Sequence, residues 1–326
     1  MIGRLGRLAG SLPVRIAVSL ALLGWLFTSH LDLGRLIRAS TGLAWPPLVA
    51  AVGALIVGRL LVTLRWKLVL GRAGRTVSFG ELLRVVFVTE GVGLLAPGNL
   101  LIEGMRMFAV SPRVGTAAAV SSVVVERSFA FAVMAGAGGV GMLFADLPLA
   151  PEFRYAGAFL LLLPTVVLAG LFAFRLPDLE EPDAGGGPVA LLRRVAVNFA
   201  FVARAPRLLF AVLGLTVAMQ GIRIAVTWLL SEAVGLSLDP HFIMILGPVA
   251  FFSGLLPVSM MGLGVREVSF VPLLALAGIG GETAVLLGLL HVAVFLPALV
   301  LPGLVLYLLG GVRLRTAPRA PAVEEG

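Results

Sequence analysis

The sequence predicts an all-α polytopic membrane protein, with about six full spans and two re-entrant helical pairs arranged as an inverted repeat. Three observations lead to this fold class. Hydrophobic residues make up 59% of the 326 residues and charged residues only 13%, and the mean hydropathy is +1.07. Mostly apolar runs of about 18 residues or more recur along the chain, which the core of a soluble protein does not require. In addition, one helix-breaking cassette occurs twice.

Six apolar stretches are long enough to cross a bilayer, which takes about 20 residues of helix. They cover residues 13–29, 45–64, 116–145, 155–174, 208–230 and 283–309. A long polar stretch, rich in Pro, Gly and acidic residues at its start, divides these spans into two sets. We therefore predict a first membrane half over 1–175, a cytoplasmic linker with an amphipathic helix over 176–206, a second membrane half over 207–312 and a disordered tail over 313–326.

The repeated cassette joins a helix breaker to a charged residue. The first copy runs from Gly93 to Pro97 (Gly-Leu-Leu-Ala-Pro), and Arg106 follows nine residues after the proline. The second copy runs from Gly254 to Pro257 (Gly-Leu-Leu-Pro), and Arg266 again follows nine residues after the proline. A broken helix with a charge at bilayer depth is costly, and transporters often carry two of them at a repeat interface.

Two apolar regions around the cassettes are interrupted and are predicted to dip into the bilayer and return. They cover residues 79–110 and 241–279, and the second is also expected to break at Pro248 and at Gly262–Gly264. Basic residues concentrate before the first span, in the 65–75 loop, in the 175–207 linker and after the last span. The positive-inside rule puts these segments and both termini in the cytoplasm. The 30–44 loop, which carries Arg35 and Arg38, conflicts mildly with this topology.

Arg106 and Arg266 are candidates for holding a lipid phosphate. A guanidinium can grip a phosphate with two hydrogen bonds, and helix N-termini present free N–H groups to anions. The alternative is a structural ion pair with a neighbouring acid, Glu103 or Glu267, or an arginine that reaches the membrane interface. An unpaired arginine at mid-bilayer is costly, so pairing is expected in either case.

Glu126 and Arg127 are adjacent in a predicted span and point about 100° apart on a helix. Each should therefore reach across to another segment, with Glu103 or Arg106 as a partner for one of them. Glu126 can be a structural bridge, part of a lipid site or a proton carrier, and Glu267 has the same three alternatives.

The remaining charged residues have simpler interpretations. Glu81 and Arg84 have the i,i+3 spacing of a local pair, whereas Glu90 has no basic residue three or four positions away and is a better cavity candidate. The interface accounts for several others: Arg59 is expected to reach the headgroups, and Arg65, Trp66 and Lys67 are expected to anchor the end of their span. Two residues of the later spans stand apart, since Arg223 has no nearby acid and His291 is expected to pack.

Five short motifs in chain order resemble one known family. They are Leu64-Arg65-Trp66-Lys67-Leu68, Ser78-Phe79, Pro97-Gly98 with Glu103 and Arg106, Val125-Glu126-Arg127, and the string from Pro257 to Glu267 that ends Gly-Leu-Gly-Val-Arg-Glu. Over about residues 10–312 the chain resembles the lysylphosphatidylglycerol synthase transmembrane-region family of flippase-like proteins. The resemblance implies a cytoplasmic-membrane protein that moves or handles lipids. It does not carry over synthase activity, because the chain shows no soluble catalytic domain after the membrane region.

The chain departs from the family pattern at both bends. Leu101, Ile102 and Glu103 stand where the family usually has two glycines and an Asp, and Met261 stands where it usually has another glycine. The first bend is therefore expected to be stiffer. The residues assigned to headgroup binding or transport are Glu90, Pro97, Gly98, Glu103, Arg106, Glu126, Arg127, Pro257, Gly262, Gly264, Arg266 and Glu267.

The leading functional hypothesis is a lipid translocase of the cytoplasmic membrane with no catalytic residues, no cofactor and no metal. The chain has no cysteine, and its three histidines are far apart, so a zinc site is not expected. The net charge of +8 is better matched to anionic headgroups than to nucleic acid, because the basic residues lie at segment ends. The expected partners are membrane lipids, with a phospholipid, a polyprenyl phosphate or a hopanoid all open as substrate. An accessory subunit of an envelope-biosynthesis enzyme is the main alternative, and an intramembrane enzyme ranks last because no Asp-x-Asp motif is present.

Overall fold

The computed structural model describes residues 20–22, 24–25, 33–71, 77–93, 99–173, 189, 193, 196–197, 204–256 and 262–310. Across these ranges the regular structure is helical. The first half contains α3 (Leu33–Thr41), α4 (Trp45–Leu70), α5 (Phe79–Gly93), α6 (Asn99–Val114), α7 (Thr116–Phe144) and α8 (Pro151–Ala173). The second half contains α10 (Pro206–Ala233), α11 (Pro240–Leu255), α12 (Val265–Ala275), α13 (Gly281–Phe295), the π-helical turn η2 (Leu296–Val300) and α14 (Leu301–Leu308).

Four of the described helical segments are long and apolar enough to cross a membrane. They are α4, the Ala118–Phe144 part of α7, α10, and the continuous segment Gly281–Leu308 that joins α13, η2 and α14. These segments match four of the predicted spans. The predicted span over 155–174 corresponds to α8, whereas the one over 13–29, the 176–206 linker with its amphipathic helix, and the 313–326 tail lie wholly or mostly outside the described residues.

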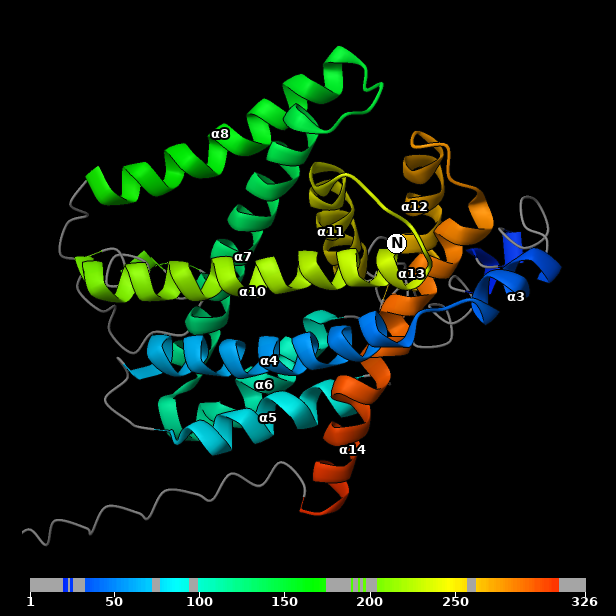
Figure 1. Ribbon diagram of the computed structural model, residues 1–326. Coiled ribbons are helices and arrows are strands. Elements are labelled where there is room, and N and C mark those ends of the chain that lie inside the picture. The colour runs from blue at the N-terminus through cyan, green and yellow to red at the C-terminus, as the bar shows by residue number, and fades with distance from the viewer. Residues whose placement is uncertain are drawn as a thin grey trace, which may run out of the picture.

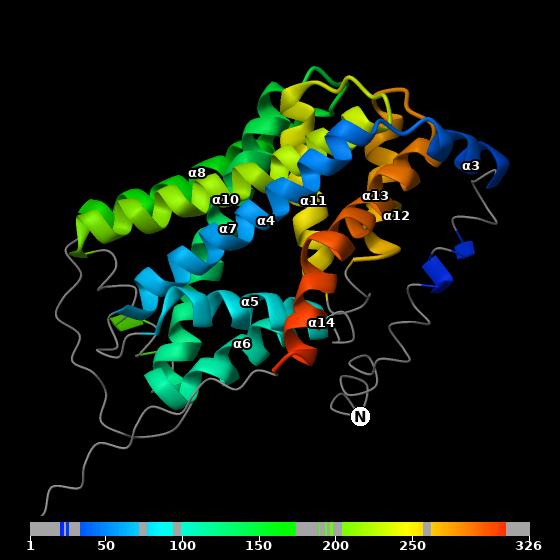
Figure 2. The same cartoon turned by 60° about the horizontal axis from the view of Figure 1, so that its bottom comes forward.

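Two long helices pair across the molecule. Helices α4 and α10 run side by side over much of their length, as both views show (Figures 1 and 2). Helix α7 crosses them and packs on α8, where Gly139 and Gly157 let the two backbones approach closely. Small residues at such crossings are the usual means of packing helices in lipid.

The first interrupted region is a helical hairpin. Helix α5 ends at Gly93 and α6 begins at Asn99, so the predicted break is present, although Pro97 and Gly98 themselves lie outside the described residues. At the open end, Glu81 in the first turn of α5 receives two hydrogen bonds from Arg113 in the last turn of α6, at 2.8 and 2.9 Å. The two helices therefore run antiparallel (Figure 2).

The predicted local pair between Glu81 and Arg84 is wrong. Glu81 instead pairs with Arg113 and also forms a capping box with Ser78, which explains why α5 begins at Phe79. Arg84 reaches the carbonyl oxygen of Leu306 on α14 at 3.4 Å. The fold-back of α6 offers Glu81 a partner that i,i+3 spacing along the sequence does not reveal.

The second interrupted region is also a pair of short helices. Helix α11 starts with Pro240 after an Asp239 side chain that accepts from the Phe242 N–H at 3.0 Å. It ends at Leu255, and α12 begins at Val265. The bend residue Pro257 lies outside the described residues.

Pro248 does not break α11, contrary to the sequence-based expectation. The helix continues through it to Leu255, since a proline removes one backbone hydrogen bond and membrane helices tolerate this where neighbours pack closely. Pro248 packs beside Gly138 of α7, where a β-carbon would lie 3.6 Å from the ring, at ordinary van der Waals contact. A second difference is α3, a short helix within the segment expected to be the 30–44 loop.

Packing partners repeat between the halves. Helix α5 packs on α14 as α11 packs on α7, and α6 packs on α7 as α12 packs on α13. The contact between α4 and α10 joins the two sets. If α4, α5, α6 and α7 are matched with α10, α11, α12 and the α13–α14 segment, each of these helix contacts therefore has a counterpart in the other half.

Candidate functional site

A cavity lies where α4, α10, α7 and the two short helical pairs meet. Its volume is about 160 Å³. Six arginines and three glutamates line it, which gives a formal net charge of +3. These charged residues are Arg59, Arg65, Arg106, Arg127, Arg223, Arg266, Glu90, Glu103 and Glu126.

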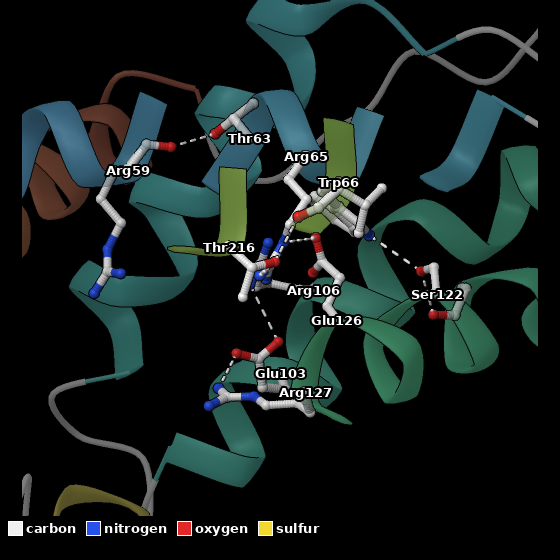
Figure 3. A network of polar contacts seen from close by, with 12 residues as sticks. Arg59, Thr63, Arg65, Trp66, Glu103, Arg106, Ser122, Glu126, Arg127 and Thr216 are labelled. Carbon is white, nitrogen blue, oxygen red and sulfur yellow. Dashed lines mark hydrogen bonds and ion pairs between the residues drawn. The ribbon is translucent and has the colours of Figure 1, made fainter. Parts of the chain in front are cut away.

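Glu103 on α6 joins two of the arginines. One carboxylate oxygen accepts from Arg106 Nη1 at 3.1 Å, and the other accepts from Arg127 Nη2 on α7. The network is drawn in Figure 3, where both arginines point at the same carboxylate. The prediction that Glu126 and Arg127 reach across to other segments, with Glu103 as one partner, is confirmed for Arg127.

Glu126 makes a different cross-helix pair. It accepts from Arg65 Nε of α4 at 3.1 Å, and Arg65 Nη1 also donates to Thr216 Oγ1 of α10 at 2.9 Å. One arginine thus ties α7 and α10 to α4. Glu126 therefore has the contacts of the structural bridge among its predicted alternatives.

Arg65 and Trp66 are not interfacial anchors. Both are buried, and Trp66 is fully enclosed, with its indole N–H donating to Ser122 Oγ at 3.2 Å. Lys67, the third member of the predicted anchor, is exposed. The α5–α6 hairpin and α7 pack over this end of α4, which its sequence alone does not indicate.

Arg106 retains hydrogen-bonding capacity inside the cavity wall. Its guanidinium lies over the Trp66 ring, 4.5 Å from the centroid, and Nη1 binds Glu103. Its Nε and Nη2 are buried and have no hydrogen-bond partner among the described residues. Buried donors without acceptors are rare in proteins because leaving them unpaired is costly, and at a cavity they indicate a place for a ligand or water.

Arg59 and Glu90 form a third ion pair. Arg59 Nη2 lies 3.0 Å from Glu90 Oε1, which links α4 to α5. The expectation that Arg59 reaches the headgroups is therefore wrong. Glu90 lines the cavity as predicted, and its partner comes from another helix.

Arg223 on α10 is the functional candidate that sequence reasoning did not select. It lines the cavity, and its guanidinium lies 5.0 Å from the centroid of the Phe251 ring of α11. Within the described part of the chain it forms no ion pair with a carboxylate. Its only sequence signal was an arginine in mid-span with no acid nearby, which is the signal that could have identified it.

The start of α12 is built around glycines. Gly262 and Gly264 have φ of +83° and +84°, a conformation that glycine adopts readily. The Gly264 N–H donates to Glu267 Oε2 at 2.6 Å. Both glycines were predicted in the site, and they shape the turn that brings Arg266 to the cavity.

Arg266 lies at the cavity, whereas the neighbouring Glu267 is buried behind it. Arg266 lines the cavity and donates to the carbonyl oxygen of Gly288 at 3.3 Å. Glu267 is fully buried and lies against Gly288, where even a β-carbon would approach its Oε1 to 2.8 Å. Glu267 is not among the residues that line the cavity, so its contacts are those of a helix cap.

His291 on α13 lines the cavity too. Its Nδ1 lies 2.9 Å from the Leu287 carbonyl oxygen, so Nδ1 carries the hydrogen, and Nε2 lies 3.1 Å from Thr227 Oγ1. The ring also packs edge-on to Phe270. These contacts fit the packing role expected for it. The described residues contain no group of three or more His, Asp or Glu placed to hold a metal.

The comparison with known families agrees with this architecture. A model of the family described as the lysylphosphatidylglycerol synthase TM region matches residues 13–303. The chain belongs to that family. Its membership, together with the four segments of the described residues that are long and apolar enough to span, identifies a multi-pass membrane protein of a lipid-related family. A search of curated proteins finds no significant match.

Proposed function

We propose that this member of the family is a flippase-like carrier and not an enzyme. It would bind the headgroup of a lipid or lipid-linked intermediate in the cavity and move it across the cytoplasmic membrane while the tails stay in the bilayer. The observation that carries this proposal is the cavity itself, which holds nine charged side chains between helices that are otherwise apolar.

The depth of the cavity supports transport. Arg59 and Arg223 lie well inside α4 and α10, two of the helices long enough to span. An arginine at the centre of a membrane helix costs about 2.5–3.5 kcal/mol on insertion scales. Ionisable residues at this depth usually face a bundle interior or a water-filled pathway, which is where these two lie.

The short helices support a re-entrant, inverted repeat. Helices α5, α6, α11 and α12 have 15, 16, 16 and 11 residues, so at 1.5 Å per residue each is shorter than the roughly 30 Å hydrocarbon core. The repeated packing partners of the two halves fit this arrangement. In transporters built from inverted repeats, the substrate site lies between the repeats at discontinuous helices.

Energy and topology complete the proposal. The sequence has no nucleotide-binding motif, so movement would follow an ion gradient or the gradient of the lipid itself. Both termini would lie in the cytoplasm, as the distribution of basic residues indicates. The headgroup would contact three arginines: Arg106, Arg223 and Arg266. The other charged residues of the site would hold these arginines or the cavity wall in place: Glu90, Glu103, Glu126 and Arg127.

Reconstitution tests the proposal. The protein is placed in liposomes with fluorescent lipids, and transbilayer movement is measured by chemical quenching of the outer leaflet. Wild type should accelerate movement, and Arg223→Gln and Arg266→Gln should abolish the acceleration while both variants stay folded. Arg154→Gln is the matched control, because Arg154 is exposed on α8, where it donates to the backbone carbonyl oxygen of Leu143.

Two results would decide against transport. Acceleration that persists in both cavity variants would place the pathway elsewhere. No acceleration with phospholipids, polyprenyl phosphates or hopanoids, together with co-purification of a biosynthetic enzyme, would favour the accessory-subunit alternative.

A further inference from the structure

The charge balance of the cavity is unequal. Six arginines face three glutamates, and each of the three glutamates is already engaged. Glu90 binds Arg59, Glu126 binds Arg65, and Glu103 binds both Arg106 and Arg127. The acidic groups of the cavity wall are thus committed to protein arginines.

Two arginines of the cavity have guanidinium groups that can still bind an anion. Arg106 Nε and Nη2 are buried without a hydrogen-bond partner in the part of the chain that the structure describes. Arg223 has the face of Phe251 beside it and forms no ion pair with a carboxylate among the described residues. An anionic oxygen would satisfy both groups, and guanidinium groups bind phosphate oxygens with good geometry.

A positively charged headgroup finds no carboxylate among the described residues of the cavity wall that is not already paired with an arginine. An aminoacylated lipid such as lysylphosphatidylglycerol, after which the family is named, carries one phosphate and two ammonium groups, a net charge of +1 near neutral pH. Each ammonium needs acceptors, preferably carboxylates, when it leaves water. Binding would break an existing ion pair or bury the ammonium beside arginines, and either change is unfavourable.

We propose that this protein recognises phosphate-bearing lipids of net negative charge and discriminates against aminoacylated, net positive ones. The proposal rests on the proposed function for the location of the site, and it adds the substrate class. Apolar side chains of the cavity, Ile102, Met219 and Phe295, would contact the first carbons of the lipid beyond its phosphate. The specificity would therefore be opposite to that expected from the family name.

Binding is the first measurement. Purified protein in neutral detergent is titrated with phosphatidic acid, phosphatidylglycerol and lysylphosphatidylglycerol of equal chain length, and bound lipid is counted by native mass spectrometry. The two anionic lipids should bind roughly 10- to 100-fold more tightly than the lysylated one, the range that one or two charged hydrogen bonds provide. Soluble glycerol phosphate is a further arm, and it should compete only weakly.

Charge reversal provides the sharper test. Arg223→Glu places a carboxylate in the cavity without breaking an observed ion pair, so it should weaken binding of the anionic lipids and strengthen binding of lysylphosphatidylglycerol. Arg223→Gln should weaken binding of the anionic lipids without strengthening binding of lysylphosphatidylglycerol. Arg223→Lys should bind the anionic lipids more tightly than Arg223→Gln does, because it keeps the positive charge. Arg154→Glu, on exposed α8, should leave the preference unchanged. Thermal unfolding of each variant confirms that a loss of binding does not come from misfolding.

The outcomes separate this inference from the proposed function. Tighter binding or faster movement of lysylphosphatidylglycerol than of the anionic lipids overturns the inference but keeps a carrier. Anionic binding that depends on Arg223, without any transbilayer movement, keeps the inference and removes the carrier. Equal binding of glycerol phosphate and lipid phosphate would assign the cavity to a soluble phosphate and overturn the lipid part of the inference.

Discussion

The two halves of the molecule carry charge into the cavity in different ways. The first half, α4 to α7, contributes four of the six arginines and all three glutamates of the cavity wall. The second half, α10 to α14, contributes Arg223 and Arg266 and no acid. The packing of the halves is alike, so the difference lies in the side chains rather than in the architecture.

The charged residues of the first half hold helices together, whereas Arg223 of the second half is available to bind a ligand. In the first half the ion pairs join α4, α5, α6 and α7 to one another. Buried ion pairs of this kind contribute little net stability, but breaking one by removing a single partner is strongly destabilising. In the second half Arg223 has no such partner among the described residues, so its charge is available to a ligand.

The largest expected effect is the loss of Glu103. Glu103→Gln leaves Arg106 and Arg127 without their shared carboxylate and should destabilise the fold by about 3–5 kcal/mol. Thermal unfolding in detergent, followed by circular dichroism, measures the change. Glu282→Gln, in the first turn of α13 and away from the cavity wall, is the control and should change stability by less than about 0.5 kcal/mol. A small effect of Glu103→Gln would mean that the first-half network does not hold the helices together.

The second largest effect on stability is expected at two close helix crossings, which correspond to each other in the packing of the two halves. A β-carbon at Gly303 of α14 would overlap the Phe87 carbonyl oxygen of α5, and one at Gly141 of α7 would lie 2.6 Å from the His241 carbonyl oxygen of α11. Gly303→Ala and Gly141→Ala should each cost about 1–3 kcal/mol, because the helices must separate. Gly136→Ala has open space around it and serves as the control on α7. A large cost at one crossing and none at the other would break the correspondence between the halves.

Arg223→Gln should have a smaller effect on stability. It removes a half-buried charge without breaking an observed ion pair and loses the contact with Phe251, so we expect a change of less than about 1 kcal/mol in either direction. The unfolding midpoint of the ligand-free protein is the measurement. A loss as large as that of Glu103→Gln would assign Arg223 a structural role and weaken the contrast between the halves.

The smallest expected effect concerns the open end of the α5–α6 hairpin. Hydrogen bonds from Arg113 hold the pKa of the Glu81 carboxyl below its usual value. A lowered pKa in the folded state means that the contribution is present at neutral pH and is lost as the pH falls through that pKa. Glu81 is partly exposed, so Glu81→Gln should cost at most about 1 kcal/mol at pH 7. The difference between wild type and variant, measured by thermal unfolding, should shrink as the pH falls through the lowered pKa of Glu81, and a constant difference would contradict the assignment.

The sequence predicted the helical class, the two interruptions and six of the nine charged residues that line the cavity. Charged residues within apolar runs are costly, so the order of residues along the chain is enough to indicate a polar interior. The choice of partners was harder to foresee. Arg65 reaches Glu126 across 61 positions, and Glu81 prefers Arg113 to Arg84, because helix packing rather than spacing along the chain decides which side chains meet.

Other errors arise because one local pattern fits two environments. An Arg-Trp-Lys sequence at the end of an apolar run is typical of a membrane interface, yet Arg65 and Trp66 are buried beneath other helices. Pro248 looks like a helix breaker, yet α11 continues through it where the helix packs against α7. Such distinctions depend on neighbours that come from distant parts of the chain.

The proposed carrier depends on a cationic, water-accessible cavity between the two halves. The wild-type chain has no cysteine, so a single Ala250→Cys places one reactive thiol in the cavity wall. Its reaction rates with a negatively charged sulfonate reagent and a positively charged trimethylammonium reagent are measured, with Ala277→Cys on an exposed turn as reference. We expect the ratio of the anionic to the cationic rate to be roughly tenfold or more higher at Ala250→Cys than at the reference. Faster reaction with the cationic reagent, or no reaction with either, would contradict it.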